Sequence, residues 1–225
     1  MSSTMAIFDL DGTLSSNHIW EGFFRYYFNH KRKRAWILAF CVTHFGLWVL
    51  AKCKLFSIKR CMVKWVEDLS GIFKGASSAE VLGVFQWVTD NYILNSLRSD
   101  IVDVLRWHKE SGHIVAIVSG ANSGLLEIVG QRLGVSTLIG TELEVINGEY
   151  TGEAVKPVCF GENKAELLER FIRQNGLKVD LSSSFAYADS IFDVPLLKMV
   201  GNPVATYPDE DLRQLAEHNG WRILP

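Results

Sequence analysis

Apolar side chains along this chain follow two different spacings. Residues 5–8, 114–118 and 185–188 are short continuous apolar runs, typical of strands that are covered on both faces. Residues 97–108 and 164–174 instead repeat apolar positions at helical spacing. Strands that alternate with helices in this way predict an α/β fold, in which a parallel sheet carries helices on both faces.

Shorter signals complete this pattern in the second half of the chain. Asn147-Gly148, in the middle of residues 143–151, favours a hairpin with a primed turn. Residues 204–206 are a candidate last strand. A final helix is expected to begin near Pro208.

A helical insertion interrupts the α/β pattern after the first strand. Residues 17–95 are aromatic and basic, contain no Pro and hold helix-compatible runs. We therefore expect a core domain made of residues 1–16 and 96–225, and an inserted helical domain made of residues 17–95. A chain of 225 residues is long enough for one domain with such an insertion.

Within the insertion, residues 35–51 form a run of 17 residues without Asp, Glu, Lys or Arg. As a helix the run would span roughly 26 Å at about 1.5 Å per residue, against a membrane hydrocarbon core of about 30 Å. Three interpretations compete: a helix buried in the insertion's own core, a helix lying in a membrane interface between basic flanks, and a spanning helix. Spanning fits worst, because the chain must return to complete the core domain.

The charge of the chain is nearly balanced but unevenly distributed. A net charge of -2 makes no case for a nucleic-acid partner. Residues 22–66 nevertheless contain ten Lys and Arg and no Asp or Glu, which suggests an anionic partner such as a membrane surface. The four cysteines lack metal-binding spacing and are expected to be reduced, mostly buried thiols. The start of the sequence has no signal-peptide pattern, so we expect a cytoplasmic protein.

Polar residues suited to binding a phosphoryl group follow the predicted strands or open the helix at residue 164. In chain order they are Asp9, Asp11, Ser119, Gly120, Lys164, Asp189 and Asp193. The carboxyl ends of parallel strands meet at one edge of a sheet, which is where ligands bind. Neighbouring carboxylates favour a divalent cation, whereas a hydroxyl, backbone N–H groups at a helix N-terminus and an ammonium favour an anion. These residue types together predict a site for a phosphate and a metal.

The segment Asp9-Leu10-Asp11-Gly12-Thr13 resembles the first motif of the haloacid dehalogenase (HAD) superfamily. Ser119, Lys164 and the pair Asp189 and Asp193 occur in the order of the other three motifs. The match is closest to subfamily IB, the phosphoserine phosphatase-like group, whose helical cap is inserted between the first two motifs. The resemblance implies a Rossmann-like core with a C1-type cap at the position of the insertion.

The same resemblance implies a role for each site residue. Asp9 is the nucleophile, which forms an aspartyl-phosphate, and Asp11 is the general acid and then the general base. Mg²⁺ is the implied cofactor, held by an Asp9 carboxylate oxygen, the Asp11 backbone carbonyl and Asp189, with Asp193 near or behind it. The residues implied to hold the phosphate oxygens are Ser119, Gly120 and Lys164.

Two departures from that group bear on the substrate. Phosphoserine phosphatases carry a Glu nine residues past the nucleophile, where it meets the substrate amine, and here that position is His18. Their fourth motif usually reads Gly-Asp-Gly-x-Asn-Asp, whereas this chain has Ala-Asp-Ser-Ile-Phe-Asp at 188–193. Loss of the Glu weakens the case for an amino-acid phosphate. It leaves His18, Trp20 and Glu21 as candidates for substrate recognition from the cap.

These features predict a Mg²⁺-dependent phosphomonoester hydrolase in the cytoplasm. The basic and apolar cap favours a lipid or amphiphilic phosphate, with peripheral contact between the cap and the anionic inner face of a membrane. A small soluble metabolite, such as phosphoserine or histidinol phosphate, is the competing class of substrate. A membrane-binding scaffold with an idle HAD site is the alternative of another class. The oligomeric state stays open.

Overall fold

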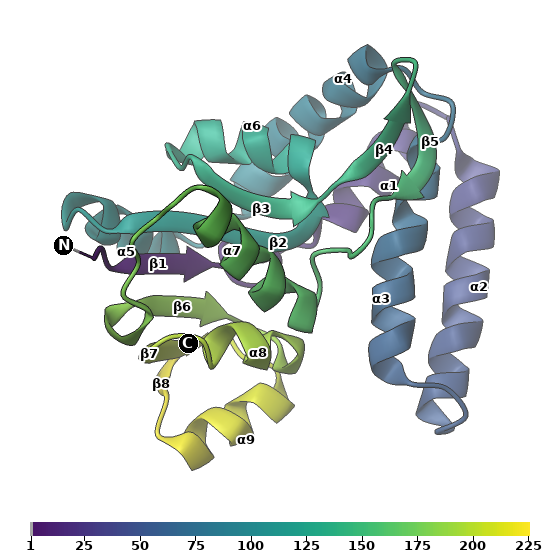
Figure 1. Cartoon of the computed structure of the whole chain (residues 1–225). Coiled ribbons are helices and arrows are strands. Elements are labelled where there is room, and N and C mark those ends of the chain that lie inside the picture. Colours follow the sequence, from purple (N-terminus) through teal and green to yellow (C-terminus); the bar gives the residue numbers. More distant parts are fainter. Residues whose placement is uncertain (1) are drawn as a thin grey trace.

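A six-stranded parallel sheet forms the centre of the protein (Figure 1). The computed structural model describes residues 2–225. The strands lie in the order β3-β2-β1-β6-β7-β8, and every neighbouring pair is parallel. Their bounds are β1 Met5–Phe8, β2 Ile114–Asn122, β3 Thr137–Thr141, β6 Phe185–Ala188, β7 Asn202–Thr206 and β8 Arg222–Leu224.

Two hydrophobic cores lie on opposite faces of this sheet, because successive side chains of a strand point to opposite faces. In β1, Phe8 belongs to one core and Ile7 to the other. Helices α5 and α6 contribute to the Phe8 core, and helices α7, α8 and α9 contribute to the Ile7 core. The bounds of these helices are α5 Ser99–Glu110, α6 Ser123–Leu133, α7 Glu162–Gln174, α8 Val194–Leu197 and α9 Glu210–Asn219. The predicted α/β fold is confirmed.

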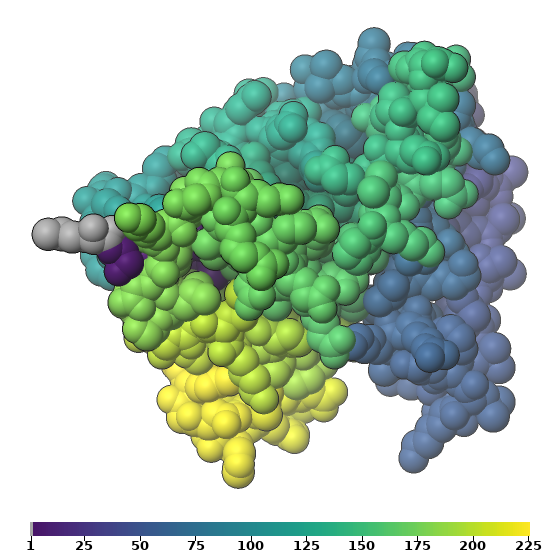
Figure 2. All heavy atoms as spheres, viewed as in Figure 1, coloured from purple at the N-terminus to yellow at the C-terminus, as the bar shows by residue number. Residues whose placement is uncertain are grey.

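The segment between β1 and α5 is helical, as predicted. Its helices are α1 Ile19–Asn29, α2 Arg34–Lys52, α3 Ile58–Leu69 and α4 Ser78–Val88. Inward aromatic side chains such as Phe23, Phe73 and Phe85 join the same core as Phe8. Figure 1 shows α2 and α3 as an antiparallel pair beside the carboxyl ends of the strands. Figure 2 shows the far end of this pair standing out from the rest of the molecule.

Helix α2 covers the predicted apolar run, but the interpretation as a buried core helix is wrong for most of its length. Its buried residues are Ile37, Phe40 and His44. The rest is largely exposed because α2 packs against α1 and α3 along one side. Cys41 and Cys53 are exposed for the same reason, contrary to our expectation of mostly buried thiols. Within residues 2–225, α2 is the one helix long and apolar enough to cross a membrane, with a mean hydropathy of 1.5.

The predicted hairpin consists of β4 (Leu143–Ile146) and β5 (Glu149–Ala154). Its turn residues Asn147 and Gly148 have φ angles of 52° and 82°, so the primed turn is confirmed. The hairpin contacts the helical insertion, because the Ser70 hydroxyl donates a hydrogen bond to the carbonyl of Gly152 at 2.7 Å.

Candidate active site

The first strand ends where the order of the sheet reverses. From β1 the chain continues to β2 and β3 on one side, whereas β6, β7 and β8 extend on the other side. Asp9 directly follows β1 and Asp189 directly follows β6, and these two strands are neighbours. Both residues therefore lie in the crevice at the carboxyl ends of the strands, the usual ligand position in such sheets.

Lys164 provides an ammonium group in this crevice. It lies in the first turn of α7 and only 4% of it is exposed. Its Nζ donates a hydrogen bond to Oδ1 of Asp9 at 2.8 Å and lies 2.7 Å from Oδ1 of Asp193. One carboxylate oxygen each from Asp9, Asp189 and Asp193 lie within 4.8 Å of one another. Residues far apart in the sequence thus meet at one point.

The residues after Asp9 are fitted closely around Asp189. Gly12 has a φ angle of 81°, a left-handed conformation that favours glycine. A Cβ at this position would lie 2.1 Å from Oδ2 of Asp189, so only glycine leaves room for that carboxylate. The Thr13 hydroxyl donates a hydrogen bond to Oδ1 of Asp189 at 3.1 Å. The Gly-Thr pair of the first motif therefore positions the Asp189 carboxylate.

Four carboxylates and one ammonium line the same pocket, and their charges shift one another's pKa values. Burial and the Asp9 carboxylate raise the pKa of Asp189 to about 8. Burial raises the pKa of Asp193 to about 6, although Lys164 opposes the shift. Burial and Asp9 also raise the pKa of Asp11 well above its ordinary value. Burial alone would lower the pKa of Lys164, but Asp193 and Asp9 raise it above its ordinary value.

These donors fit a hard divalent cation. Mg²⁺ prefers oxygen ligands, and the clustered carboxylates of Asp9, Asp189 and Asp193 supply them. The excess of negative charge in the pocket is the kind that a divalent cation neutralises. Gly12 and Thr13 keep Asp189 within the cluster. Asp193 is a member of this cluster and also pairs with Lys164.

Asp11 connects the crevice to the helical insertion. Its Oδ1 accepts a hydrogen bond from the backbone N–H of Ile19 at 3.2 Å, and Ile19 is the first residue of α1. Asp11 also lines the active-site pocket, which has a volume of about 210 Å³. Its carboxylate therefore lies between the side of the pocket formed by the sheet and the side formed by the insertion.

The predicted phosphate-binding residues Ser119 and Gly120 line the pocket at the end of β2. Ser119 is buried, and its Oγ accepts a hydrogen bond from the backbone N–H of Ala121 at 3.2 Å. Of the three predicted recognition residues, His18 and Trp20 line the pocket. Glu21 is outside this lining, and its carboxylate accepts a hydrogen bond from the Tyr92 hydroxyl.

Several residues that line the pocket were not predicted from the sequence. Helix α3 contributes Met62, Trp65, Val66 and Leu69, and the core contributes Phe160 and Phe192. The amphipathic pattern of α3 predicts a buried face, but periodicity does not distinguish a face packed in a core from one that lines a cavity.

Comparison with known proteins identifies the family. Residues 6–198 match the family described as haloacid dehalogenase-like hydrolase, which covers more than half of the chain. The chain belongs to this family of hydrolases, and the resemblance predicted from its motifs is confirmed.

Individual relatives include proteins named as phosphatases. A Mycobacterium tuberculosis protein named phosphoserine phosphatase SerB1 is 29% identical over 97% of this chain and 69% of its own length. A Neisseria meningitidis histidinol-phosphatase is 31% identical over 52% of this chain and 54% of its own length. The solved structure of a Bordetella pertussis protein of unknown function has a TM-score of 0.83 and 26% identity, and the match covers 100% of this chain and 99% of that one.

Proposed function

We propose that this HAD hydrolase is a phosphatase that cleaves phosphomonoesters through an aspartyl-phosphate on Asp9. The observation that carries the proposal is the buried Asp9 carboxylate at the reversal point of the sheet, 2.8 Å from the Lys164 ammonium and in the lining of a 210 Å³ pocket. The names of the mycobacterial and neisserial relatives support the same reaction class.

The reaction takes two steps. An oxygen of Asp9 attacks phosphorus, the bond between phosphorus and the substrate's alcohol oxygen breaks, and Asp11 gives its proton to that oxygen. Asp11 then takes a proton from water, whose oxygen attacks phosphorus and releases inorganic phosphate from Asp9. Burial and the Asp9 charge raise the pKa of Asp11, which favours the protonated acid that the first step needs.

The other site residues bind charge. We propose that Ser119, Gly120 and Lys164 hold the phosphate oxygens, since a buried ammonium and hydrogen-bond donors stabilise negative charge in a low-dielectric site. Mg²⁺ would be held by the carboxylates of Asp9 and Asp189 and the Asp11 backbone carbonyl, with Asp193 beside them. When bound, Mg²⁺ supplies positive charge to the phosphoryl oxygens.

The helical insertion is proposed to act as a cap that selects the substrate. Residues 17–95 would form the cap, and residues 1–16 and 96–225 would form the core. His18 and Trp20 line the pocket from the cap side, where they would meet the alcohol part of the substrate. The names of the relatives favour a small soluble metabolite such as phosphoserine or histidinol phosphate.

A lipid or amphiphilic phosphate is the second candidate substrate, and the exposed side of α2 favours it. Leu38, Val42 and Phe45 are more than 60% exposed on this helix, and the basic run Lys31–Arg34 ends at its first residue. Apolar side chains beside basic residues bind the surface of anionic membranes. We propose peripheral contact of the cap with the inner face of a membrane, from the cytoplasmic side.

Hydrolysis of para-nitrophenyl phosphate tests the reaction class. The unaltered protein should turn over the ester with Mg²⁺ and lose activity with EDTA. Asp9→Asn should abolish turnover, because the amide is a poor nucleophile of nearly the same shape. Asp103→Asn, on the exposed side of α5, is a matched control that should keep full activity. Turnover by Asp9→Asn would contradict the mechanism, and an inactive unaltered protein would favour a membrane-binding scaffold instead.

A further inference from the structure

A second cavity lies beside the active-site pocket, between α2 and α3. Its volume is about 610 Å³. Its walls come from α1, α2 and α3, and we call it the α2–α3 groove. The walls include Trp20, Val42, Phe45, Trp48, Met62 and Trp65. An apolar cavity of this size, next to a pocket that we propose binds a phosphate, is large enough to hold a substantial part of a ligand.

The groove and the active-site pocket meet at shared side chains. Trp20, Met62 and Trp65 line both cavities. The rings of Trp20 and Trp65 lie edge to face with their centroids 5.5 Å apart. An apolar surface therefore continues from the pocket that contains Asp9 into the groove.

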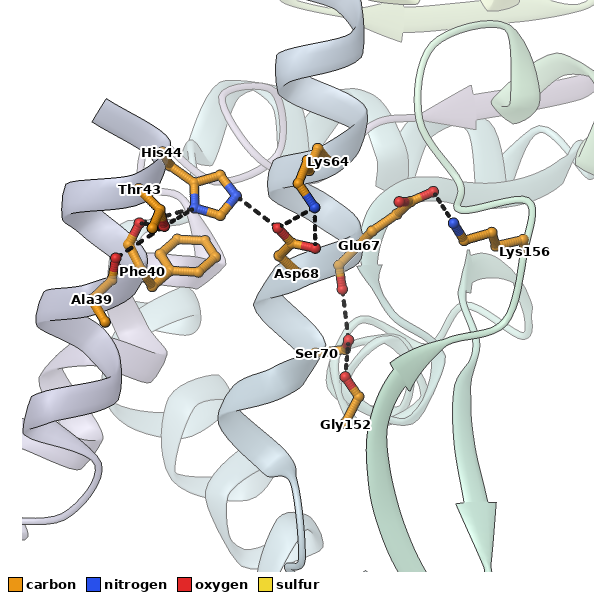
Figure 3. A network of polar contacts seen from close by, with 10 residues as sticks. All are labelled: Ala39, Phe40, Thr43, His44, Lys64, Glu67, Asp68, Ser70, Gly152 and Lys156. Atoms are coloured by element: carbon orange, nitrogen blue, oxygen red, sulfur yellow. Dashed lines mark hydrogen bonds and ion pairs between the residues drawn. The ribbon is translucent and has the colours of Figure 1, made fainter. Parts of the chain in front are cut away.

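The ring nitrogens of His44, which also borders the groove, face Phe40 and Asp68 (Figure 3). Its Nδ1 donates a hydrogen bond to the carbonyl of Phe40 at 2.9 Å, because a carbonyl oxygen can only accept. Its Nε2 lies 3.3 Å from Oδ2 of Asp68 on α3. The groove is thus an apolar surface, suited to a hydrocarbon rather than to a second polar group.

The same network holds the walls of the groove in place (Figure 3). The contact between His44 and Asp68 joins α2 to α3. Helix α3 is tied to the core, because the Lys156 ammonium lies 3.1 Å from Oε1 of Glu67. The hydrogen bond from Ser70, which follows α3, to Gly152 on β5 adds a second tie. A groove with fixed walls binds a chain with less loss of entropy than one that must first be ordered.

We propose that the α2–α3 groove binds the hydrocarbon chain of the substrate, so that the enzyme acts on phosphomonoesters that carry a single apolar chain. This inference rests on the proposed phosphatase function. The occupant is assigned by continuity: the groove and the active-site pocket share Trp20, Met62 and Trp65, so a chain joined to a phosphate at Asp9 would lie next to the groove. The basic residues near the same helix pair would favour a lipid phosphate at an anionic surface.

A series of straight-chain alkyl phosphates, from ethyl to decyl and each below its micelle concentration, tests this assignment. Burial of each methylene should raise kcat/KM about fourfold until the groove is full, after which the values should level off. The ratio of kcat/KM for octyl phosphate to that for ethyl phosphate measures the contribution of the groove. Because both values come from the same variant, the ratio does not depend on the overall activity of that variant.

Two substitutions locate the effect. Phe45→Asp places a charge in the groove at a side chain that is 64% exposed, so the fold should tolerate it. It should lower the octyl-to-ethyl ratio at least tenfold, because a charge strongly disfavours a neighbouring hydrocarbon chain. Leu55→Asp is the matched control, since Leu55 is 76% exposed and lies outside the groove lining. It should leave the ratio unchanged.

The outcomes separate this inference from the function on which it rests. An enzyme that hydrolyses ethyl and octyl phosphate equally well overturns the groove assignment and leaves the phosphatase intact. An unchanged ratio in Phe45→Asp overturns it as well. If no ester is hydrolysed, binding of octyl and ethyl phosphate to Asp9→Asn is compared by calorimetry. Tighter binding of octyl phosphate that is lost when Phe45→Asp is added supports the groove assignment. Equal binding of the two esters overturns it.

Discussion

Replacing Gly12 by Ala tests how closely the first motif is fitted to the site. The φ angle of 81° would cost a residue with a Cβ about 1–2 kcal/mol of folding free energy. The new Cβ would also lie 2.1 Å from Oδ2 of Asp189, so this carboxylate must move by about 1 Å to restore van der Waals contact. A displacement of that size in an active site costs about 100-fold in rate.

Gly220→Ala separates these two effects. Gly220 follows α9 with a φ angle of 66°, and a Cβ there would meet no heavy atom within 4 Å. It therefore shares the backbone cost but not the contact with Asp189. Urea unfolding should show similar losses for both variants. Steady-state kinetics with Mg²⁺ should show a loss of about 100-fold for Gly12→Ala only.

The refuting result is specific. If Gly12→Ala keeps kcat/KM within about twofold of Gly220→Ala at saturating Mg²⁺, the position of the Asp189 carboxylate has no bearing on the reaction. The close fit at Gly12 would then be a packing feature of the turn.

Three further predictions concern charge. Lys164→Met should lower the free energy of unfolding by about 3–5 kcal/mol in urea titrations with EDTA, because it leaves the buried Asp9 and Asp193 carboxylates without their cation. Burial and Asp9 raise the pKa of Asp189 from its ordinary value of 3.8 to about 8. Between these two pH values the Asp189 carboxyl keeps its proton in the folded protein but has lost it in the unfolded chain. Stability in EDTA should therefore fall as pH rises from 5 to 8, and Asp189→Asn should reduce this fall in thermal unfolding. Neutralising Lys31–Arg34 should weaken co-sedimentation with anionic vesicles at least tenfold, because each basic residue near such a surface contributes about 1 kcal/mol.

Each of these predictions has an outcome that contradicts it. Unfolding of Lys164→Met within 1 kcal/mol of the unaltered protein would mean that its partners are not held as buried charges. The same pH dependence in Asp189→Asn and the unaltered protein would show that another group titrates. Binding to vesicles that survives neutralisation of the basic run, or that is absent at low salt, would count against membrane contact.

The core of the fold was predictable because its signals are local. The continuous apolar run of β1 and the acids that follow it mark both the strand and its end, and the Asn147-Gly148 turn marks the hairpin. The strands β3 and β8 were not predicted. Thr137–Thr141 contains Gly140 and two Thr, and Arg222–Leu224 is three residues long. Their pairing with β2 and β7 depends on contacts between distant segments, which local patterns do not report.

The site was predictable in part for the same reason. Asp9, Lys164 and Asp189 are charged residues at the ends of predicted strands or at the start of a predicted helix, which made them recognisable. The structure places them together. The side of the pocket formed by the helical insertion was less accessible to prediction. Met62 and Trp65 look like ordinary members of an amphipathic helix, and Glu21 is engaged by Tyr92, a partner far away in sequence. The packing of a helix in the insertion, and not its own sequence, decides which of its faces lines a cavity.

Trapping the covalent intermediate tests the central claim most directly. Turnover of a phosphomonoester with Mg²⁺ is stopped with acid, the protein is reduced with borohydride, and peptides are analysed by mass spectrometry. Reduction of an aspartyl-phosphate converts the aspartate to homoserine. The mechanism predicts homoserine at position 9 only, dependent on substrate and lost in Asp9→Asn. Active enzyme with no modified residue, or with the modification elsewhere, would contradict it.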